Sequence, residues 1–302
     1  MENLEKNAIL NFNSDTLDSV RSKCGLNKKV IDQSLDILDE WLIKQRHFVK
    51  KDFSKEYLER CLIMNKGSVE KTKLKLDQMC TVKKLLPHFF TTLDIKKDLA
   101  NNIVSALLPT LTSEHERVYM LKALHIAHNE TISIMRSMLC EYIKAYDYNN
   151  GCIIVLDYSS TNLLELLPKM NPVEIHQFAN LTSSMRLKGI HLISGSKVIE
   201  VLVSLLKSAL SVKLGERIFV HKNYESLCEV IPKNILPQEY GGSEKSLEEL
   251  NERMMDELSS EGFVRYLGEM SKATTDESAR PAHEFNEQYL GAAGSFRVIS
   301  VD

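Results

Sequence analysis

Apolar residues recur at helical spacing through the first hundred positions of the chain. In KKVIDQSLDILDEWLIKQR, from Lys28 to Arg46, the main apolar positions fall three or four residues apart, which places them on one face of a helix. Two further helices are predicted to begin at Ser54 and at Ser68, the second ending before Pro87. The pattern therefore predicts a small bundle of amphipathic helices.

After Pro109 short continuous apolar runs replace the helical period. The runs CIIVLD, at 152–157, and GIHLIS, at 189–194, contain β-branched residues and follow turn-forming or polar positions. Such runs are typical of strands buried on both faces. Further strands are predicted at 117–124 and 218–220, and helices over a stretch that ends at Ile143, from Pro172, and over 197–211. Strands that alternate with helices predict an α/β fold with parallel strands.

The last sixty residues have a simpler pattern. Beyond Gly242, Ser246 and Glu249 have the spacing of a capping box, which predicts the start of one amphipathic helix. A polar surface loop is expected after it. The chain has only 12 glycines and 7 prolines, so the composition does not favour a loop-rich or all-β protein.

Charge and cysteine content limit the classes of function. With 38 basic and 41 acidic residues the net charge is −3, which excludes a nucleic-acid binder that relies on bulk positive charge. The apolar runs are far shorter than the ~20 residues of a membrane-spanning helix, and the first residues, MENLEKNAIL, lack the order of a signal peptide. We expect a cytoplasmic protein whose six cysteines are reduced and mostly buried.

Most catalytic motifs are missing from the sequence. There is no GxGxxG after a strand, no GxxxxGK[ST], no HExxH and no GxSxG. Asp157 ends a predicted strand, where a turn-capping role is favoured over a catalytic one. His125 and His128, near Glu130 and His115, do not have the spacing of a tetrahedral metal site. We therefore expect no catalytic residue, no metal and no cofactor.

The helix predicted at 197–211 is unusual because it is apolar on most of its surface. Only Glu200, Ser204, Lys207 and Ser208 form a polar stripe in KVIEVLVSLLKSAL. A surface helix normally has one apolar stripe, so this helix has two sides to bury. Protein on both sides satisfies the pattern, and so does protein on one side with a bound lipid on the other.

Basic residues gather on both sides of that helix. From 185 to 233 there are 8 Lys or Arg and 4 Asp or Glu, a local charge of +4. Arg186 and Lys188 alternate at the entry to a strand, and Lys213 and Arg217 are four residues apart, so each pair can share a face. A solvated basic face is one reading. The other reading is that these residues bind a phosphate-rich head group or an anionic membrane. Four cations would then contribute roughly 4 kcal/mol to the binding free energy.

These segments resemble a known family. RLKGIHLISGSKVIEVLVSLLKSALSVKLGERIFVH, followed by LPQEYGG at 236–242, resembles the CRAL-TRIO (Sec14-like) lipid-binding family, and within it the alpha-tocopherol transfer protein branch. The ending GSFRVISVD is also similar to that branch. The resemblance implies a helical N-terminal domain at 1–95, a CRAL-TRIO lipid-binding domain at 96–245 with a mostly parallel sheet floor and a mobile gate helix, and a C-terminal helix and tail at 246–302.

The resemblance also implies functional residues. The gate corresponds to the apolar helix, and a basic cleft beside the gate binds phosphoinositide head groups in the tocopherol-transfer branch. The implied lipid-binding residues are Ile154, Leu156, Phe178, Ile190, Ile199, Leu202, Leu205 and Leu206. The implied phosphoinositide-binding residues are Arg186, Lys188, Lys213 and Arg217.

The sequence departs from the family at several of these places. The family's run LLRFLRAR reads YLERCLIMNKG here, so that Arg60 keeps the first arginine while Ile63 and Asn65 replace the other two. This removes a cation that would join the basic cleft. Ser208 stands where a proline is common, and Ile199 and Ala209 stand where relatives often have aromatic residues, so the identity of the ligand does not carry over.

The function that the resemblance implies is that of an intracellular carrier. It would enclose one small lipophilic molecule of the tocopherol, retinoid or carotenoid kind and transfer it as a monomer at phosphoinositide-containing membranes, to which it binds peripherally. The alternative is a lipid-sensing regulator or scaffold that docks a protein partner without net transport. An enzyme that acts on the bound lipid is disfavoured because the nucleophile motifs are missing.

Overall fold

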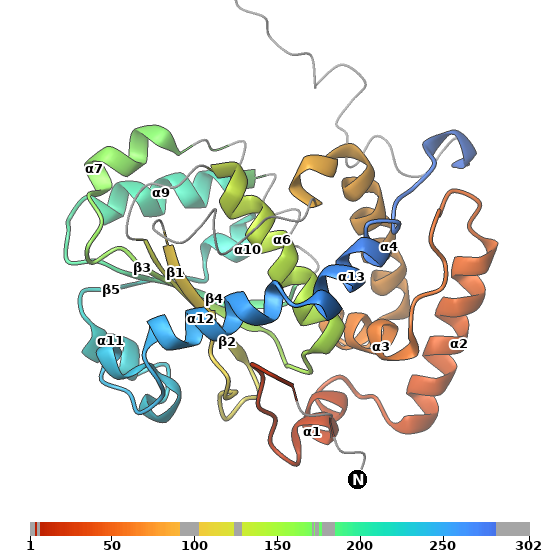
Figure 1. Cartoon of the computed structure of the whole chain (residues 1–302), viewed down its shortest axis with the longest axis horizontal. Coiled ribbons are helices and arrows are strands. Elements are labelled where there is room, and N and C mark those ends of the chain that lie inside the picture. The colour runs from red at the N-terminus through yellow and green to blue at the C-terminus, as the bar shows by residue number, and fades with distance from the viewer. Residues whose placement is uncertain are drawn as a thin grey trace, which may run out of the picture.

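The fold is a five-stranded sheet covered by helices on both faces, with a layer of further helices at one end (Figure 1). It is taken from a computed structural model of the chain. The structure describes residues 4, 7–90, 103–123, 129–170, 172, 175–176 and 185–281. Phe178, His125 and His128 lie outside these residues, as does most of the helix predicted from Pro172.

The strands follow one another across the sheet in the order β1-β2-β3-β4-β5. Their bounds are Ile103–Leu107, Arg117–Ala123, Cys152–Asp157, Leu187–Ile193 and Ile218–His221. β1 pairs antiparallel with β2, and all other neighbours are parallel. The prediction of a mostly parallel α/β sheet is confirmed. β1 was not predicted, because the buried Ser105 interrupts its apolar pattern.

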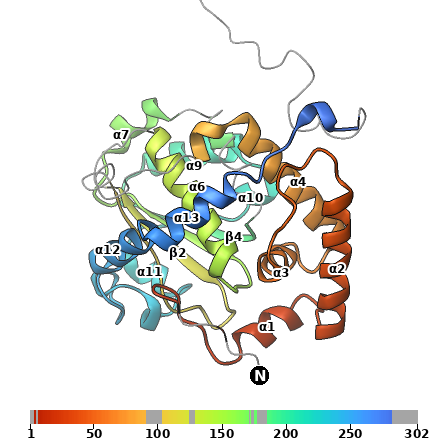
Figure 2. The ribbon, with the colours of Figure 1, turned by 45° about the vertical axis from the view of Figure 1, so that its right-hand side comes forward.

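Within residues 7–90, four helices form the N-terminal layer, which Figure 2 shows beside the sheet. They are α1 (Thr16–Ser22), α2 (Lys28–Lys44), α3 (Lys55–Met64) and α4 (Val69–Leu85). The predicted starts of α3 and α4 are confirmed, since the side chains of Ser54 and Ser68 accept hydrogen bonds from the N–H groups of Tyr57 and Lys71. α1 is an additional helix that the sequence pattern did not predict.

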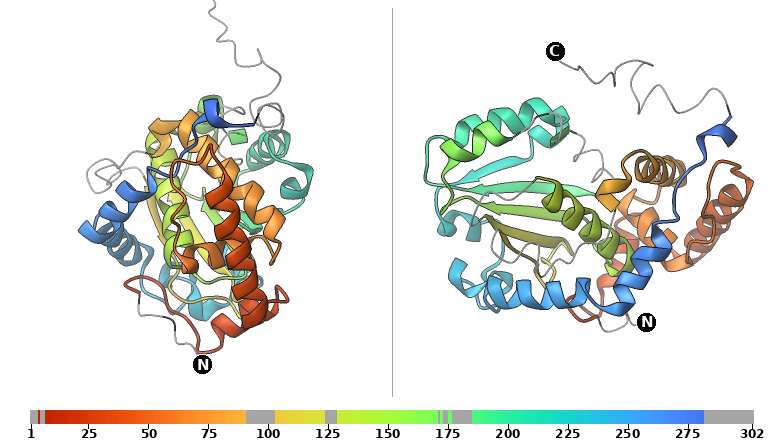
Figure 3. Two further views of the ribbon diagram at one scale, coloured as in Figure 1. Left: turned by 90° about the vertical axis from the view of Figure 1, so that its right-hand side faces the viewer. Right: turned by 45° about the horizontal axis from the view of Figure 1, so that its top comes forward.

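Most of the other described helices cover the two faces of the sheet, whereas α13 packs against α6 and α12. The right-hand view of Figure 3 has α7 and α9 above the sheet and α12 below it. The bounds are Asn129–Tyr146 (α6), Leu163–Leu166 (α7), Ile199–Ala209 (α9), Val212–Gly215 (α10), Tyr224–Cys228 (α11), Leu247–Leu258 (α12) and Glu261–Met270 (α13). Short 3₁₀ turns span Pro87–Phe90, Leu167–Lys169, Lys233–Ile235, Gln238–Tyr240 and Glu277–Ala279.

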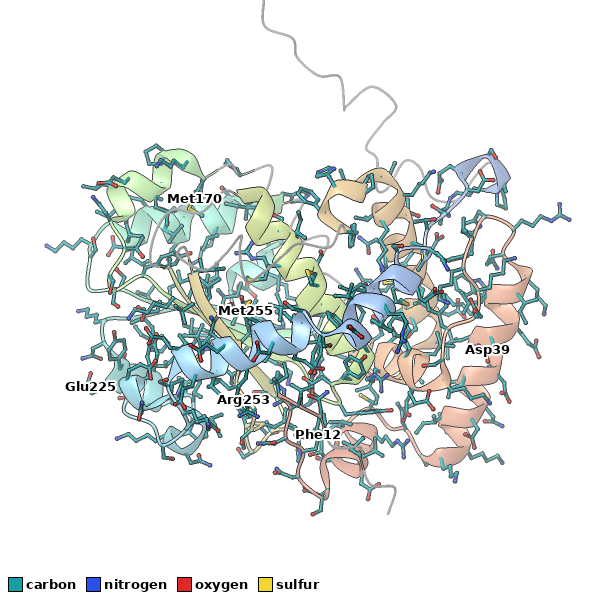
Figure 4. The ribbon with its side chains drawn as sticks, in the orientation of Figure 1. Phe12, Asp39, Met170, Glu225, Arg253 and Met255 are labelled. Atoms are coloured by element: carbon teal, nitrogen blue, oxygen red, sulfur yellow. The ribbon has the colours of Figure 1, made fainter. Side chains whose placement is uncertain are left out.

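As far as it is described, to residue 281, the C-terminal part contains two helices, where a single helix was expected. The predicted capping box is present, with Ser246 and Glu249 bonded to each other's backbone N–H. α12 ends at Leu258, and the side chain of Ser260 then caps a second helix, α13. α12 runs beside β1 and places Met255 in the same apolar cluster as α6, as Figure 4 illustrates with Met255 labelled.

The helix α6 joins the N-terminal layer to the sheet domain through buried polar contacts. Glu141 Oε1 lies 3.0 Å from Lys83 Nζ of α4 and 2.5 Å from Lys144 Nζ. Arg60 Nε of α3 donates to the Lys144 carbonyl at 2.7 Å. All of these side chains are at most 8% exposed. A buried charge of this kind is tolerated only while its partners stay in place, so the contacts fix α3, α4 and α6 relative to one another.

We predict that Glu141→Gln destabilises the fold by about 3–5 kcal/mol at neutral pH, because it leaves two buried ammonium groups without their carboxylate. Burial raises the pKa of Glu141, but Lys144 and Lys83 outweigh it and bring the pKa from 4.5 down to about 2. The stabilisation is therefore complete above the unfolded pKa and is lost as the pH falls from 4.5 toward 2. Urea unfolding of both proteins across this range measures the difference.

Glu269→Gln is the matched control, because Glu269 pairs with Lys272 in an exposed i,i+3 contact at 3.0 Å. Its effect should stay within about 1 kcal/mol at every pH. Equal losses for the two variants, or a Glu141→Gln deficit that does not shrink in acid, would contradict the prediction.

Candidate functional site

One face of the sheet carries two rows of side chains that run across the central strands. Tyr119 of β2 is in register with Ile154 of β3, which is in register with Ile190 of β4. The next row consists of Leu121, Leu156 and Leu192. Because alternate residues of a strand point to the same side, all six lie on one face. We call this set of six residues the sheet floor.

The sheet floor is less tightly covered than the opposite face. Ile153 and Val155, which point to the other side of β3, are 5% and 0% exposed and pack with α11 and α12. Ile154 and Leu156 alternate with them on the same central strand, yet both remain partly exposed. A central strand is normally buried on both faces in a sheet of this type. Solvent-accessible surface therefore remains over the middle of the sheet floor.

The helix α9 lies over one part of this face. Ile199 and Leu202, 5% and 0% exposed, form an apolar cluster with Ile190, Leu192 and Leu163. Other members of the cluster come from the end of α7 and the turn after it, including Met170, which is labelled in Figure 4. α6 covers the neighbouring part of the floor, with Met135, Met138 and Leu139 packed near Leu121. The predicted apolar helix is thus confirmed as an element that packs on the sheet.

The structure brings most of the residues named as lipid-binding to this region. Ile154, Leu156 and Ile190 belong to the floor, and Ile199 and Leu202 face it from α9. Leu206 packs against the same cluster, and Leu205 is partly buried on α9. In contrast, Val201 is 57% exposed on the outer side of the helix. α9 therefore has an apolar residue on its solvent side as well as on its sheet side.

The four predicted cations have different surroundings. An Arg186 Nη1 donates to Asn150 Oδ1 at 2.7 Å, and an Arg217 Nη1 donates to the Leu187 carbonyl. Lys188 forms an ion pair with Glu116 at 2.7 Å, in which the side chains are 25% and 15% exposed. The charge of Lys188 is therefore partly neutralised within the protein, whereas Lys213 lies on the short helix α10.

A fifth cation, Lys66, joins this cluster from the N-terminal layer. The charge of Arg186 lowers the pKa of Lys66 most, followed by that of Lys213, while Arg217 has a smaller effect. Lys66 follows α3 directly and has a left-handed backbone, with φ of 57°, and Gly67 after it has φ of 74°. Sequence reasoning missed Lys66, although the turn signal Asn65-Lys66-Gly67 marks the place. We call Lys66, Arg186, Lys213 and Arg217 the cation cluster.

The residues of the segment that differs from the family run make contacts within the protein itself. Ile63 is 2% exposed in the core of the N-terminal layer, and the Asn65 amide donates to the Cys61 carbonyl. Arg60, which keeps the family's first arginine, is 8% exposed and lies with its guanidinium 5.1 Å from the Tyr148 ring. Arg60 therefore belongs to the interior, and the basic contribution of this segment comes from Lys66.

The LPQEYGG segment supports the sheet from its other side. The hydroxyl of Tyr240 donates to Asp157 Oδ2 at 2.8 Å, and Asp157 Oδ1 accepts from the Ser159 N–H at 2.8 Å. Asp157 is 1% exposed, so it caps the end of β3, as the sequence indicated. A Cβ on Gly242 would lie 1.9 Å from the Leu236 carbonyl oxygen, which explains the requirement for glycine there.

Three further observations concern metal ligands, membrane spans and cysteines in the part of the chain that is described. Within it, no three His, Cys, Asp or Glu side chains are grouped so as to hold a metal ion. None of its helices is both long and apolar enough to cross a membrane. The six cysteines are free thiols, and four of them are buried. Burial raises the pKa of Cys61 and Cys140 to about 11, which suppresses their reactivity.

Comparison with known proteins identifies two matching regions. Residues 104–242 match the family model of the CRAL/TRIO domain, and residues 27–100 match that of the Pinta-like UBA domain. The sequence is 27% identical over 120 residues to an "Alpha-tocopherol transfer protein-like" protein of Mus musculus, and 25% identical over 120 residues to the Homo sapiens protein of that name. Each match covers 38% of this chain and 35% of the relative.

The solved structure of Sfh5 aligns with a TM-score of 0.45 and 11% identity, over 80% of this chain and 93% of that one. The CRAL/TRIO match begins within β1 and ends at Gly242, so it contains the whole sheet, α9 and the LPQEYGG segment. The mostly parallel sheet and the apolar helix over its floor agree with this match in sequence, so residues 104–242 form a CRAL-TRIO domain.

Proposed function

We propose that this protein is a carrier that encloses one small lipophilic molecule of the tocopherol, retinoid or carotenoid kind between α9 and the sheet floor. The observation that supports it most is the partial exposure of Ile154 and Leu156 beneath an apolar helix. A CRAL-TRIO domain implies binding and transfer of lipophilic ligands, and residues 104–242 match that domain. The relatives named alpha-tocopherol transfer protein-like agree with the proposed ligand class.

The physical reason for such a carrier is the cost of apolar surface in water. Transfer out of water stabilises a hydrocarbon chain by about 0.8 kcal/mol of free energy for each methylene. A closed apolar site therefore binds such a chain firmly. Release requires α9 to move away from the floor, which exposes Ile199 and Leu202. Next to a bilayer, lipid replaces water against these residues. In this proposal α9 is the mobile gate, and no covalent bond is made or broken.

The cation cluster is the proposed membrane-binding part of the mechanism. Lys213 follows α9 directly on α10, and Arg186 and Arg217 flank β4 and β5, the strands beneath α9. Near an anionic surface each cation contributes about 1 kcal/mol, enough for reversible binding to phosphoinositide-containing membranes. We propose a cytoplasmic monomer that binds such membranes peripherally. A head group that binds better to the open state would shift α9 toward release.

Native mass spectrometry tests the enclosure of a ligand. We expect the purified chain, incubated separately with α-tocopherol, retinol, a carotenoid and a phospholipid, to form a one-to-one complex with at least one of them. Extraction with organic solvent should return the ligand unchanged, as a carrier without catalytic activity requires. If none of the four binds, the enclosure proposal is wrong, and the alternative of a scaffold that docks a protein partner is favoured.

The double variant Lys213→Ala with Arg217→Ala tests the transfer step. We expect transfer of the bound ligand to vesicles that contain phosphoinositide to slow about tenfold or more, since two cations worth ~1 kcal/mol each are lost. Affinity for the ligand should change less than about twofold, because neither residue belongs to the floor. Lys245→Ala with Lys272→Ala removes two distant lysines as the matched control. Equal transfer rates for parent and test variant would refute the membrane role.

The contrast between Lys66 and Lys188 tests the composition of the cation cluster. We expect Lys66→Ala to weaken binding to phosphoinositide vesicles about fivefold, because the loss of one cation costs ~1 kcal/mol. Lys188→Ala should weaken it less, since Glu116 already neutralises part of that charge. Vesicle sedimentation at low and at physiological salt measures both, and the Lys66 effect should shrink at high salt. The reverse order of the two variants would show that Lys66 is not part of the surface.

A further inference from the structure

Two buried histidines contact each other between β4 and the edge strand β5, which is labelled at the left of Figure 1. Nδ1 of His191 lies 2.9 Å from Nε2 of His221, and the two residues are 3% and 6% exposed. Their rings stack with centroids 5.1 Å apart, and the Phe219 ring stacks on His191 at the same distance. Because His191 alternates with floor residues along β4, it lies on the opposite face of the sheet. The proposed carrier mechanism uses neither histidine.

The hydrogen bonds around this histidine pair determine which ring nitrogens carry protons. The Ser226 hydroxyl donates to the Asn223 carbonyl at 3.0 Å, so its oxygen accepts from Nδ1 of His221, 3.3 Å away. Nε2 of a neutral His221 is then an acceptor, and Nδ1 of His191 donates to it. The remaining lone pair of the two rings is therefore on Nε2 of His191.

A proton that joins the pair has an unfavourable position. It binds Nε2 of His191, for which the described residues provide no hydrogen-bond acceptor. This nitrogen lies against Gly189, where an added Cβ would be only 2.6 Å away. Burial, followed by the charge of His221, lowers the pKa of His191 from 6.5 to about 4. Both rings are therefore neutral at pH 7 while the contact is formed.

The charged groups of the neighbouring elements do not offset a proton on the pair. Glu229, at the end of α11, favours a charged His221, but burial outweighs it and lowers the pKa of His221. Asp157 of β3 lies in the same row as His221, two strands away, and its carboxylate already accepts hydrogen bonds from Tyr240 and Ser159. Lys222, directly after His221, is exposed and positive. Acid therefore charges the pair without supplying a partner for the new charge.

The strand that the pair holds is short and connected to the gate. β5 has four residues and pairs only with β4, and its Phe219 and Val220 are 47% and 43% exposed. Such a segment can separate locally at a free energy well below that of global unfolding. β5 follows α9 and α10 in the chain, and Ile218 packs against the apolar cluster of α9. A change in the attachment of β5 therefore reaches α9.

We propose that the His191–His221 hydrogen bond is a pH-sensitive contact, which holds β5 on β4 while both rings are neutral and releases β5, and with it the support of α9, when the pair is protonated. The released state binds more protons, so the contact is complete above pH about 6.5 and is lost as the pH falls toward 4. For His191 alone this linkage raises the population of the released state about twentyfold between pH 7 and pH 5. The consequence for cargo, faster release in acid, rests on the proposed carrier function.

Amide hydrogen exchange of the ligand-free full chain, followed by mass spectrometry at pH 7 and pH 5, tests the contact. Rates are corrected for the pH dependence of the chemical exchange step. We expect the protection of β5, at 218–221, to fall about twentyfold more than that of β3, at 152–157, which is the internal reference. The protection of α9, at 199–209, should fall together with that of β5.

His191→Gln removes the titrating ring while its amide can still donate to His221. In this variant the fall in β5 protection between pH 7 and pH 5 should shrink to about threefold or less, because the main proton-binding nitrogen is gone. His47→Gln is the matched control. His47 is 4% exposed and contacts Asp77 at 3.2 Å in the N-terminal layer, so this variant should retain the twentyfold fall at β5.

Imidazole nitrogen NMR of the unaltered chain keeps the test decisive if His191→Gln folds poorly. At pH 7 both rings should carry their proton on Nδ1, and His191 should stay neutral down to pH about 5. A proton on Nε2 of either ring at pH 7 would overturn the inference. So would equal losses of protection in β5 and β3, or an undiminished fall at β5 in His191→Gln.

These outcomes are separate from those of the carrier function, because exchange is measured without ligand. A loss of protection at β5 without one at α9 would overturn the link between the histidine pair and the gate. If none of α-tocopherol, retinol, carotenoid and phospholipid binds, the carrier function fails, whereas acid-dependent exchange at β5 and α9 still supports the pH-sensitive contact.

Discussion

The ion pairs of Glu141 with Lys83 and Lys144 are the constraint on which the arrangement of the two halves depends. They are buried, so each charge depends on the opposite charge beside it for most of its stabilisation. Because Glu141 lies on α6 and Lys83 on α4, the contacts fix the N-terminal layer against the helix that covers part of the sheet floor. The N-terminal layer also supplies Lys66 to the cation cluster. The ion pairs of Glu141 thus fix the proposed cargo region and the proposed membrane surface relative to each other, although they belong to neither.

The fold was largely predictable from the periodicity of apolar residues. Continuous runs such as CIIVLD are buried on both sides, and this is the simplest relation between a pattern and a structure. Prediction failed where a short element has mixed polarity. β1 contains the buried Ser105, whose N–H is satisfied by Asn251 of α12 at 3.1 Å, a partner that no local pattern reveals. The division of the C-terminal region into α12 and α13 depends on a cap at Ser260. The residues on both sides of Ser260 follow one helical period, so the apolar pattern alone predicts a single helix.

The candidate site was predictable only in its apolar part. Ile190, Ile199 and Leu202 belong to strands and helices whose inner faces follow from alternation and period, so the sequence identified residues that pack together. Polar members were harder to find. Lys66 comes close to Arg186 through the turn after α3, and Lys188 is partly neutralised by Glu116 from another segment.

The way α9 is attached has a consequence for the energetics of opening. β3 is joined to β2 and β4 by backbone hydrogen bonds along its whole length, whereas α9 holds to the sheet through the side chains of Ile199, Leu202 and their neighbours. Segments that rely on side-chain contacts can separate at a free energy well below that of global unfolding, while a strand bonded on both edges separates only with the whole domain. α9 can therefore form a cooperative unit of its own, with a local stability set by one small apolar cluster. A molecule bound beneath it would add to that cluster, so the occupancy of the site and the rigidity of its cover would rise and fall together.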